Sequence, residues 1–170
     1  MARRQEILIA GGAGFIGVNA AHRLLRKGHK VTVLDNLSRK GTRSNLAWLK
    51  KEFPKLAFIK CDIRDYPKVR RAFRECGKVD VVLHQAAQVA VTTSVVNPRE
   101  DFEINALGTF NLLEATREHY GLSPSRKKKA PFFLFSSTNT KNVPHFRFAL
   151  NTFNNFEILF SQYNFGCVIV

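Results

Sequence analysis

Apolar runs of strand length alternate with stretches of helical periodicity over the first 136 residues of the chain. Five short runs rich in Val, Ile, Leu and Phe predict β-strands at residues 6–10, 30–34, 56–60, 79–83 and 132–135. Between them, apolar side chains recur every three or four positions. This spacing predicts helices over residues 15–26, 45–52, 67–76 and 98–120.

This alternation predicts an α/β fold. Neighbouring parallel strands require a crossover connection, and a helix after nearly every strand supplies one. The predicted strands are almost continuously apolar, as expected when both faces of a sheet are covered. We therefore expect a doubly wound parallel sheet with helices on both faces.

The pattern changes near residue 141. From 142 to 170 only Arg147 and Glu157 carry a fixed charge, and the segment contains six phenylalanines. We divide the chain into a unit with this α/β pattern at residues 1–141 and an atypical Phe- and Asn-rich tail at 142–170. Within the tail, residues 152–162 have the pattern of a helix, and 167–170 that of an apolar strand.

Composition narrows the class of protein. A chain of 170 residues with 45% apolar composition suffices for the core of one domain. No apolar run approaches the roughly 20 residues that cross a bilayer, so we expect a cytoplasmic protein. Three cysteines without a C-x-x-C spacing predict neither a disulfide framework nor a zinc site.

The net charge of +14 comes partly from two clusters, at residues 70–74 and 126–129. A nucleic-acid interface would pair such clusters with aromatic residues or with a recognisable binding module. The first cluster instead falls on a predicted helix and the second in a loop. We interpret both as solvated surface, so nucleic acid is not an expected partner.

A glycine-rich segment carries the first chemical signal. Gly11, Gly14 and Gly17 lie between the first predicted strand and the first predicted helix. Glycines in this context allow a tight turn and a close approach of backbone N–H groups to a pyrophosphate at the helix N-terminus. The context is that of the Rossmann dinucleotide-binding fold.

Asp35 ends the second predicted strand, 18 positions after Gly17. A carboxylate here accepts hydrogen bonds from the hydroxyls of an adenosine ribose and repels the extra phosphate of NADP. NAD is therefore the favoured cofactor, although the nearby Arg39 weakens that preference.

Three further strand ends carry candidate residues. Asp62 and Ile63 follow the third strand, where they would meet the adenine amino group and ring. Residues 84–87 follow the fourth strand, and small side chains there would let a dinucleotide cross the sheet edge. Residues 136–138 follow the fifth, and Thr138 would face a substrate, because ligands of open α/β sheets lie beyond the carboxyl ends of the strands.

Taken in order, these motifs resemble the extended short-chain dehydrogenase/reductase family of NAD-dependent epimerases and dehydratases. The resemblance covers residues 6–139 and includes Asn105-x-x-Gly108-Thr109. Within the family, residues 35–41, 45–49, 88–94 and 101–105 are most similar to CDP-tyvelose and CDP-paratose 2-epimerases. The motifs and the resemblance together assign cofactor binding to Gly11, Gly14, Phe15, Ile16, Gly17, Asp35, Asn36, Asp62, Ile63, Ala86, Ala87, Asn105 and Ser136.

The resemblance implies reversible hydride transfer between NAD and a sugar hydroxyl, with a nucleotide sugar, and specifically a CDP-sugar, as substrate. Thr138 would then hydrogen-bond the sugar. The family also uses a Tyr-x-x-x-Lys pair, whose lysine lowers the pKa of the tyrosine. The 170 residues contain no such pair, because the residues four places after the three tyrosines are Arg70, Pro124 and Cys167.

The tail admits two interpretations. Anchoring on Glu157 places Phe153 in the lysine position and Ala149 in the tyrosine position. Alternatively, the tail has left the family pattern through truncation or a change of reading frame after Thr138. Under either interpretation we expect the sheet to be incomplete at its C-terminal side and the substrate-binding portion to be missing.

Three hypotheses about function remain open. The chain is a truncated or degenerate enzyme without turnover, a non-catalytic dinucleotide-binding or regulatory module, or an active enzyme with a different proton carrier. An incomplete open sheet exposes apolar surface and an unpaired edge. We therefore also expect marginal solubility and a tendency to form oligomers or aggregates.

Overall fold

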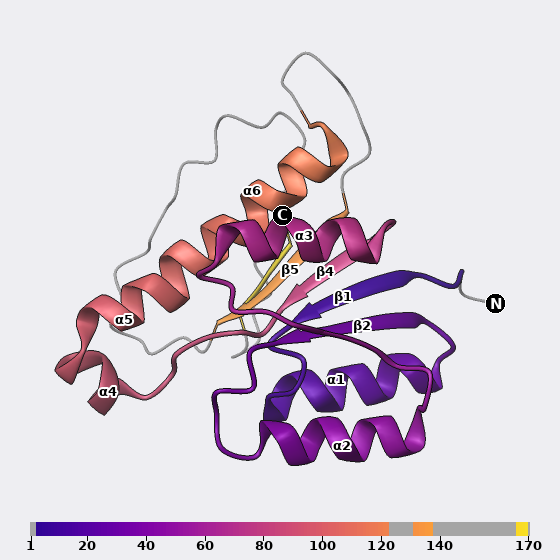
Figure 1. The fold of residues 1–170 in the computed structure, drawn as a ribbon, viewed down its shortest axis with the longest axis horizontal. Helices are drawn as coiled ribbons and strands as arrows, with labels where there is room; N and C mark the ends of the chain where they lie inside the picture. Colours follow the sequence, from indigo (N-terminus) through magenta and orange to yellow (C-terminus); the bar gives the residue numbers. More distant parts are fainter. Residues whose placement is uncertain (1–2, 123–130, 138–165, 170) are drawn as a thin grey trace.

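The computed structural model describes residues 3–122, 131–137 and 166–169. They form one six-stranded sheet with the strand order β3-β2-β1-β4-β5-β6 (Figure 1). The strands are β1 (Glu6–Ala10), β2 (Lys30–Asp35), β3 (Ala57–Lys60), β4 (Val81–His84), β5 (Phe132–Ser137) and β6 (Gly166–Ile169). β1 to β5 are parallel, which confirms the predicted sheet.

Helices cover both faces of the sheet, as predicted. α1 (Phe15–Arg26) and α2 (Thr42–Glu52) lie on one face, and α3 (Tyr66–Cys76) and α6 (Gly108–Tyr120) lie on the other (Figure 1). β1 shows how the sequence builds this arrangement. Ile7 and Ile9 belong to the core under α1 and α2, whereas Leu8 and Ala10 belong to the core under α3 and α6. The strand is therefore apolar from Ile7 to Ala10, the part that is buried on both sides.

The boundaries of two elements differ from prediction for identifiable reasons. α2 begins at Thr42 instead of residue 45, because Gly41 turns the chain with φ +88° and the Thr42 hydroxyl donates to the Arg39 carbonyl. β4 begins at Val81 instead of residue 79. The Val79 N–H donates to the Tyr120 hydroxyl instead of to a strand, whereas Asp80 bonds to Glu6 through both its carboxylate and its own N–H.

The helix predicted over residues 98–120 is divided. α5 (Pro98–Phe102) leads into a π-helical turn η1 (Glu103–Leu107), and α6 follows directly. A short additional helix, α4 (Val91–Val96), precedes α5 and was not predicted. π-helical turns inside helices are frequent at functional sites. This one contains Asn105, a predicted cofactor residue.

The predicted strand in the tail forms as β6, shifted by one residue toward the N-terminus. It pairs with β5 in the antiparallel direction, for example Ser136 with Cys167. The sequence predicted an apolar strand here within a parallel sheet, and β6 departs from that sheet by running antiparallel to β5. An edge strand can complete the ladder of its neighbour in either direction, and antiparallel edge strands on parallel sheets are common.

Other predictions about the tail remain untested. The predicted helix at 152–162 lies outside the described residues, as does Val170. The division into units at 1–141 and 142–170 stays a prediction. Within the described part of the chain, no helix has the length and apolar character needed to cross a membrane.

Candidate functional site

The glycine segment forms a tight loop between β1 and α1. The Gly11 N–H donates to the Leu34 carbonyl at 2.8 Å, and Gly11 has φ +77°. A Cβ atom at Gly11 would lie 2.4 Å from the Ala86 nitrogen, and one at Gly17 would lie 2.2 Å from the Gly11 carbonyl oxygen. The loop thus packs main chain against main chain, which only glycine permits.

The N-terminus of α1 opens at the carboxyl edge of the sheet. Gly14 is the N-cap residue in an extended conformation, no side chain caps this helix, and its first turn contains no acidic residue. Phe15 and Ile16 are exposed. Backbone N–H groups at such a helix start, together with the helix dipole, favour an anionic group such as a pyrophosphate.

Asp35 ties this loop to the end of β2. The side chain is buried, and its carboxylate accepts hydrogen bonds from the N–H of Ala13 at 3.1 Å and of Leu37 at 2.8 Å. The Ala13 carbonyl accepts in turn from the Asn45 side chain at 2.9 Å. A carboxylate has about four acceptor positions, so Asp35 retains capacity for two further donors, as a ribose diol requires.

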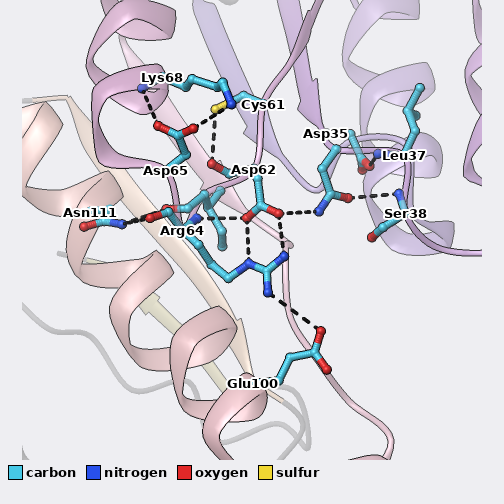
Figure 2. Close-up of polar contacts among 12 residues, drawn as sticks. Asp35, Leu37, Ser38, Cys61, Asp62, Arg64, Asp65, Lys68, Glu100 and Asn111 are labelled. Atoms are coloured by element: carbon cyan, nitrogen blue, oxygen red, sulfur yellow. Dashed lines mark hydrogen bonds and ion pairs between the residues drawn. The ribbon is translucent and has the colours of Figure 1, made fainter.

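Asp62 lies just after β3 (Figure 2), within hydrogen-bond distance of Asn36. Its Oδ1 accepts from the Arg64 N–H and from Arg64 Nε, both at 3.0 Å. Its Oδ2 accepts from Arg64 Nη2 at 2.8 Å and from Asn36 Nδ2 at 3.0 Å. The hydrogen bonds from Arg64 are the main reason that the pKa of Asp62 falls to about 2, so this group is a carboxylate at neutral pH.

Ile63 faces the interior. Its side chain is 5% exposed and packs against Gly108. The contact is so close that a Cβ atom added to Gly108 would lie 2.5 Å from Ile63 Cδ1. The buried Asn111 of α6 donates to the carbonyls of Ile63 and Arg64 at 2.9 and 3.1 Å. The turn after β3 is therefore fixed from α6.

The end of β4 combines a buried histidine with small residues. His84 is 1% exposed, and its Nε2 lies 2.9 Å from the Thr109 hydroxyl. Burial lowers the pKa of His84 to about 4, so the imidazole is neutral at physiological pH. Ala86 packs against Gly11, as described above, which places the predicted residues Ala86 and Ala87 beside the glycine loop.

Asn105 acts on the backbone of the loop after β4. Its amide accepts from the Gln88 N–H at 2.8 Å and donates to the Gln88 carbonyl at 2.9 Å and to Asp101 at 3.1 Å. The Gln88 side chain accepts from Arg39 Nη2 at 2.9 Å. This last hydrogen bond links the loop after β2 to the loop after β4.

The structure brings together the predicted residues from the glycine loop and from the ends of β2, β3 and β4. Ser136 lies in β5, and Thr138 lies outside the described residues. Four residues of the network were not predicted: Asn45, Arg64, Gln88 and Asn111. Arg64 had a recognisable signal, since an arginine two positions after an aspartate at a strand end can fold back onto it. The others make contacts that only the tertiary fold creates.

The cysteines and potential metal ligands add no chemistry here. Burial is the main cause that raises the pKa of Cys61 and of Cys76 to about 11, so both remain protonated thiols at neutral pH. Among the residues that the structure describes, no group of three or more His, Cys, Asp or Glu side chains is arranged to hold a metal ion.

Comparison with known proteins gives a consistent result. The sequence pattern of the GDP-mannose 4,6 dehydratase family matches residues 8–140. CDP-paratose 2-epimerase of Salmonella typhi is 46% identical over 114 residues, which are 67% of this chain and 33% of the relative. dTDP-glucose 4,6-dehydratase of Neisseria meningitidis is 35% identical over 140 residues, which are 82% of this chain and 38% of the relative.

Solved structures agree. UDP-glucose 4-epimerase of Thermus thermophilus, in complex with NAD, has a TM-score of 0.59 and 46% identity, covering 69% of this chain and 35% of that one. UDP-glucose 4-epimerase of Stenotrophomonas maltophila, with bound NAD and formylated UDP-arabinopyranose, has a TM-score of 0.62 and 31% identity, covering 71% of this chain and 35% of that one. The chain thus spans about a third of the length of these relatives.

Proposed function

The chain belongs to the GDP-mannose 4,6 dehydratase family and is homologous to nucleotide-sugar epimerases and dehydratases, and on this premise we propose that it binds NAD without completing sugar chemistry. The proposal has two parts, a cofactor site at the carboxyl edge of the sheet and a lack of turnover. They rest on different residues.

The single observation that carries the cofactor site is the joint packing of Gly11 and Asp35. The main-chain contact between Gly11 and Ala86 leaves no room for a side chain, and the Asp35 carboxylate fixes the same loop through the Ala13 N–H. A glycine-rich turn without a ligand would not require a buried carboxylate at its side. The loop, the uncapped start of α1 and the carboxylate fit a dinucleotide pyrophosphate and ribose.

Asp35 and Arg39 support NAD over NADP. The Asp35 carboxylate is buried at the end of β2, where it would repel a 2′-phosphate on the ribose. The Arg39 guanidinium is the nearest candidate for binding that phosphate, but it donates to the Gln88 side chain. Its hydrogen bond favours a bridging role between loops.

The lack of turnover rests on the absent Tyr-x-x-x-Lys pair. NAD, when bound, would accept the hydride from the carbon that bears a sugar hydroxyl. The hydroxyl proton must leave at the same time, and a general base near neutral pH is needed for that transfer. His84 does not suit this role, because it is buried and its pKa is about 4. Thr138 would hydrogen-bond a nucleotide sugar, of the CDP-sugar class, without taking its proton.

Calorimetric titration of the full chain with NAD and, separately, with NADP tests the cofactor site. We expect NAD to bind more tightly and Asp35→Ala to weaken NAD binding at least tenfold, because two ribose hydrogen bonds are lost. Asp65→Ala is the matched control, since Asp65 caps α3 through the Lys68 N–H on the surface. No heat with either dinucleotide, from a chain that melts cooperatively, would refute the site.

Turnover is measured separately. The chain is incubated with NAD and a CDP-sugar, and epimerised or oxidised products are followed by chromatography and by the absorbance of NADH. We expect neither product. Detectable conversion that disappears in Thr138→Val would show that the chain uses another proton carrier, and this part of the proposal would fail while the cofactor site stood.

A further inference from the structure

The carboxylate of Asp62 is saturated by donors from the protein itself. Both oxygens accept two hydrogen bonds each, three from Arg64 and one from Asn36 (Figure 2). A carboxylate offers about four acceptor positions. An adenine amino group that reaches Asp62 must therefore replace one of these donors.

The donors differ in how readily they leave. Arg64 holds Asp62 through two side-chain nitrogens at 3.0 and 2.8 Å, a charge-assisted fork that is stronger than a neutral hydrogen bond. Asn36 contributes one neutral amide N–H at 3.0 Å from the loop after β2. Replacing the Asn36 amide by the amino group of a base exchanges one neutral donor for another, so it costs less than displacing Arg64.

Arg64 is also held in place from outside the pair. Its carbonyl accepts from the buried Asn111 of α6, and its Nη1 lies 3.7 Å from Glu100 of α5. Figure 2 shows the guanidinium between the two carboxylates, with Glu100 on the side away from Asp62. Arg64 therefore orients Asp62 and is itself held by residues of α5 and α6.

We propose that Arg64 is a positioning residue that makes Asp62 select an amino group at the purine 6-position, with Asn36 as the internal donor that this amino group replaces. The inference rests on the proposed NAD site and names the residues that decide which base that site accepts.

Because Asp62 is a carboxylate, it favours a base that donates a hydrogen bond over one that accepts. With a pKa of about 2, the group is an acceptor over the whole physiological range and has no proton to donate. Adenine presents N–H donors at the 6-position, whereas hypoxanthine presents a carbonyl oxygen. Asp62 then keeps its four donors from the protein, and the hypoxanthine carbonyl oxygen faces a carboxylate without a donor, which disfavours hypoxanthine by about tenfold to a hundredfold.

The test compares NAD with nicotinamide hypoxanthine dinucleotide by calorimetric titration of the full chain. The two ligands differ only at the base, so their affinity ratio reports selection and is insensitive to a general loss of folded protein. We expect the wild-type chain to prefer NAD at least tenfold, and Arg64→Gln to reduce the ratio to about threefold or less. Arg64→Lys, which keeps the charge but loses the fork, should retain an intermediate ratio.

Two further variants separate Arg64 from its neighbours. Asn36→Ala removes the donor that must leave but keeps the Arg64 fork on Asp62, so we expect the affinity ratio to be kept, whatever the change in NAD affinity itself. Arg71→Gln is the matched control, because Arg71 pairs with Glu75 on the exposed side of α3 and should change neither value. Circular dichroism melts of every variant confirm that folded chains are compared. If Arg64→Gln does not fold, the affinity ratios of Arg64→Lys and Asn36→Ala test the role of Arg64 instead.

The outcomes are distinguishable. An unchanged ratio in Arg64→Gln, or a loss of selectivity in Asn36→Ala, overturns this inference while the NAD site stands. An equal affinity of the wild-type chain for both dinucleotides overturns selection by Asp62. Binding of neither dinucleotide by the wild-type chain overturns the proposed function and this inference together.

Discussion

The first half of the chain, from β1 to α3, differs from the second half, from β4 onward, in how its side chains are satisfied. In the first half, the polar residues at the strand ends are engaged by one another and by the backbone, as Asp35 and Asp62 show. In the second half, most of the exposed large apolar side chains are found, and neither α4 nor α5 buries a residue.

The two halves of the chain therefore differ in how much of their apolar surface the described residues bury. In the first half, the helices bury apolar residues on both faces of the sheet, and on the face of α3 this core is shared with α6 of the second half. The second half presents apolar faces, including those of Val95, Val96 and Phe102, that the described residues leave exposed. The relatives that this chain matches are about three times longer than the chain.

The largest expected effect contrasts two phenylalanines. Phe73 of α3 is fully buried, and Phe73→Ala should lower the free energy of unfolding by about 3–5 kcal/mol, because a large cavity opens in the core. Phe110 of α6 is 58% exposed, and Phe110→Ala should cost less than about 1 kcal/mol. Urea denaturation measures both. Similar losses would show that the exposed face is in fact covered in solution.

A second contrast isolates packing from backbone strain. Gly11 and Gly28 both have positive φ, but a Cβ at Gly11 collides with Ala86, whereas nothing lies within 4 Å of a Cβ at Gly28. Gly28→Ala should cost about 1–2 kcal/mol from the backbone alone. Gly11→Ala should cost about 2 kcal/mol more, because the two halves of the sheet edge must separate. Thermal melts at matched pH compare the two, and equal losses would refute the tight contact.

His84 should make the stability of the second half depend on pH. Its pKa is about 4 in the folded chain, against 6.5 for the unfolded residue. Between these values the unfolded chain takes up a proton and the folded chain does not, so stability falls as the pH falls from 6.5 to 4 and this contribution then levels off. The loss is at most about 3 kcal/mol.

The variant His84→Asn tests this dependence. Asparagine does not titrate, so urea denaturation of the variant at several pH values should lack the loss between pH 6.5 and 4. The difference between the wild-type and variant curves removes the contribution of the carboxyl groups common to both. Parallel curves would mean that the His84 pKa is not lowered by burial.

The smallest expected effect concerns the exposed valines of α4. Val95 and Val96 are 76% and 85% exposed, so replacing both by serine should change the free energy of unfolding by less than about 1 kcal/mol. We expect the same change to reduce self-association, because contiguous exposed apolar surface promotes contact between molecules. Sedimentation velocity at several concentrations measures it. Unchanged association would show that the molecules associate through residues other than these two valines.

Sequence reasoning predicted the first half with little error. β1 and α1 match residue for residue, because an apolar strand, a glycine turn and a helix of clear periodicity leave few alternatives. The family was also predictable, since its motifs lie at strand ends in a fixed order. The bonding of Asp62 to Arg64 was overlooked, although the two residues are neighbours in sequence.

Other features were beyond prediction for physical reasons. α4 is too short to show a helical period, and the turn η1 preserves the apolar spacing that predicted one long helix. The direction of β6 could not be predicted, because an apolar strand has the same composition in either direction. Contacts such as that of Asn111 with the Arg64 carbonyl join residues far apart in sequence, so no local pattern marks them.

Two of the crowded glycines, Gly108 and Gly11, have different consequences for how this sequence can change over generations. At Gly108 the obstacle is the side chain of Ile63, so a larger residue there can be accommodated by a smaller partner, and the two positions can drift together. At Gly11 the obstacle is the main chain of Gln85 and Ala86, which every amino acid shares. No second-site substitution at those positions relieves it, so a selection for suppressors should recover compensating pairs at 108 and 63 and none at 11 with 85 or 86.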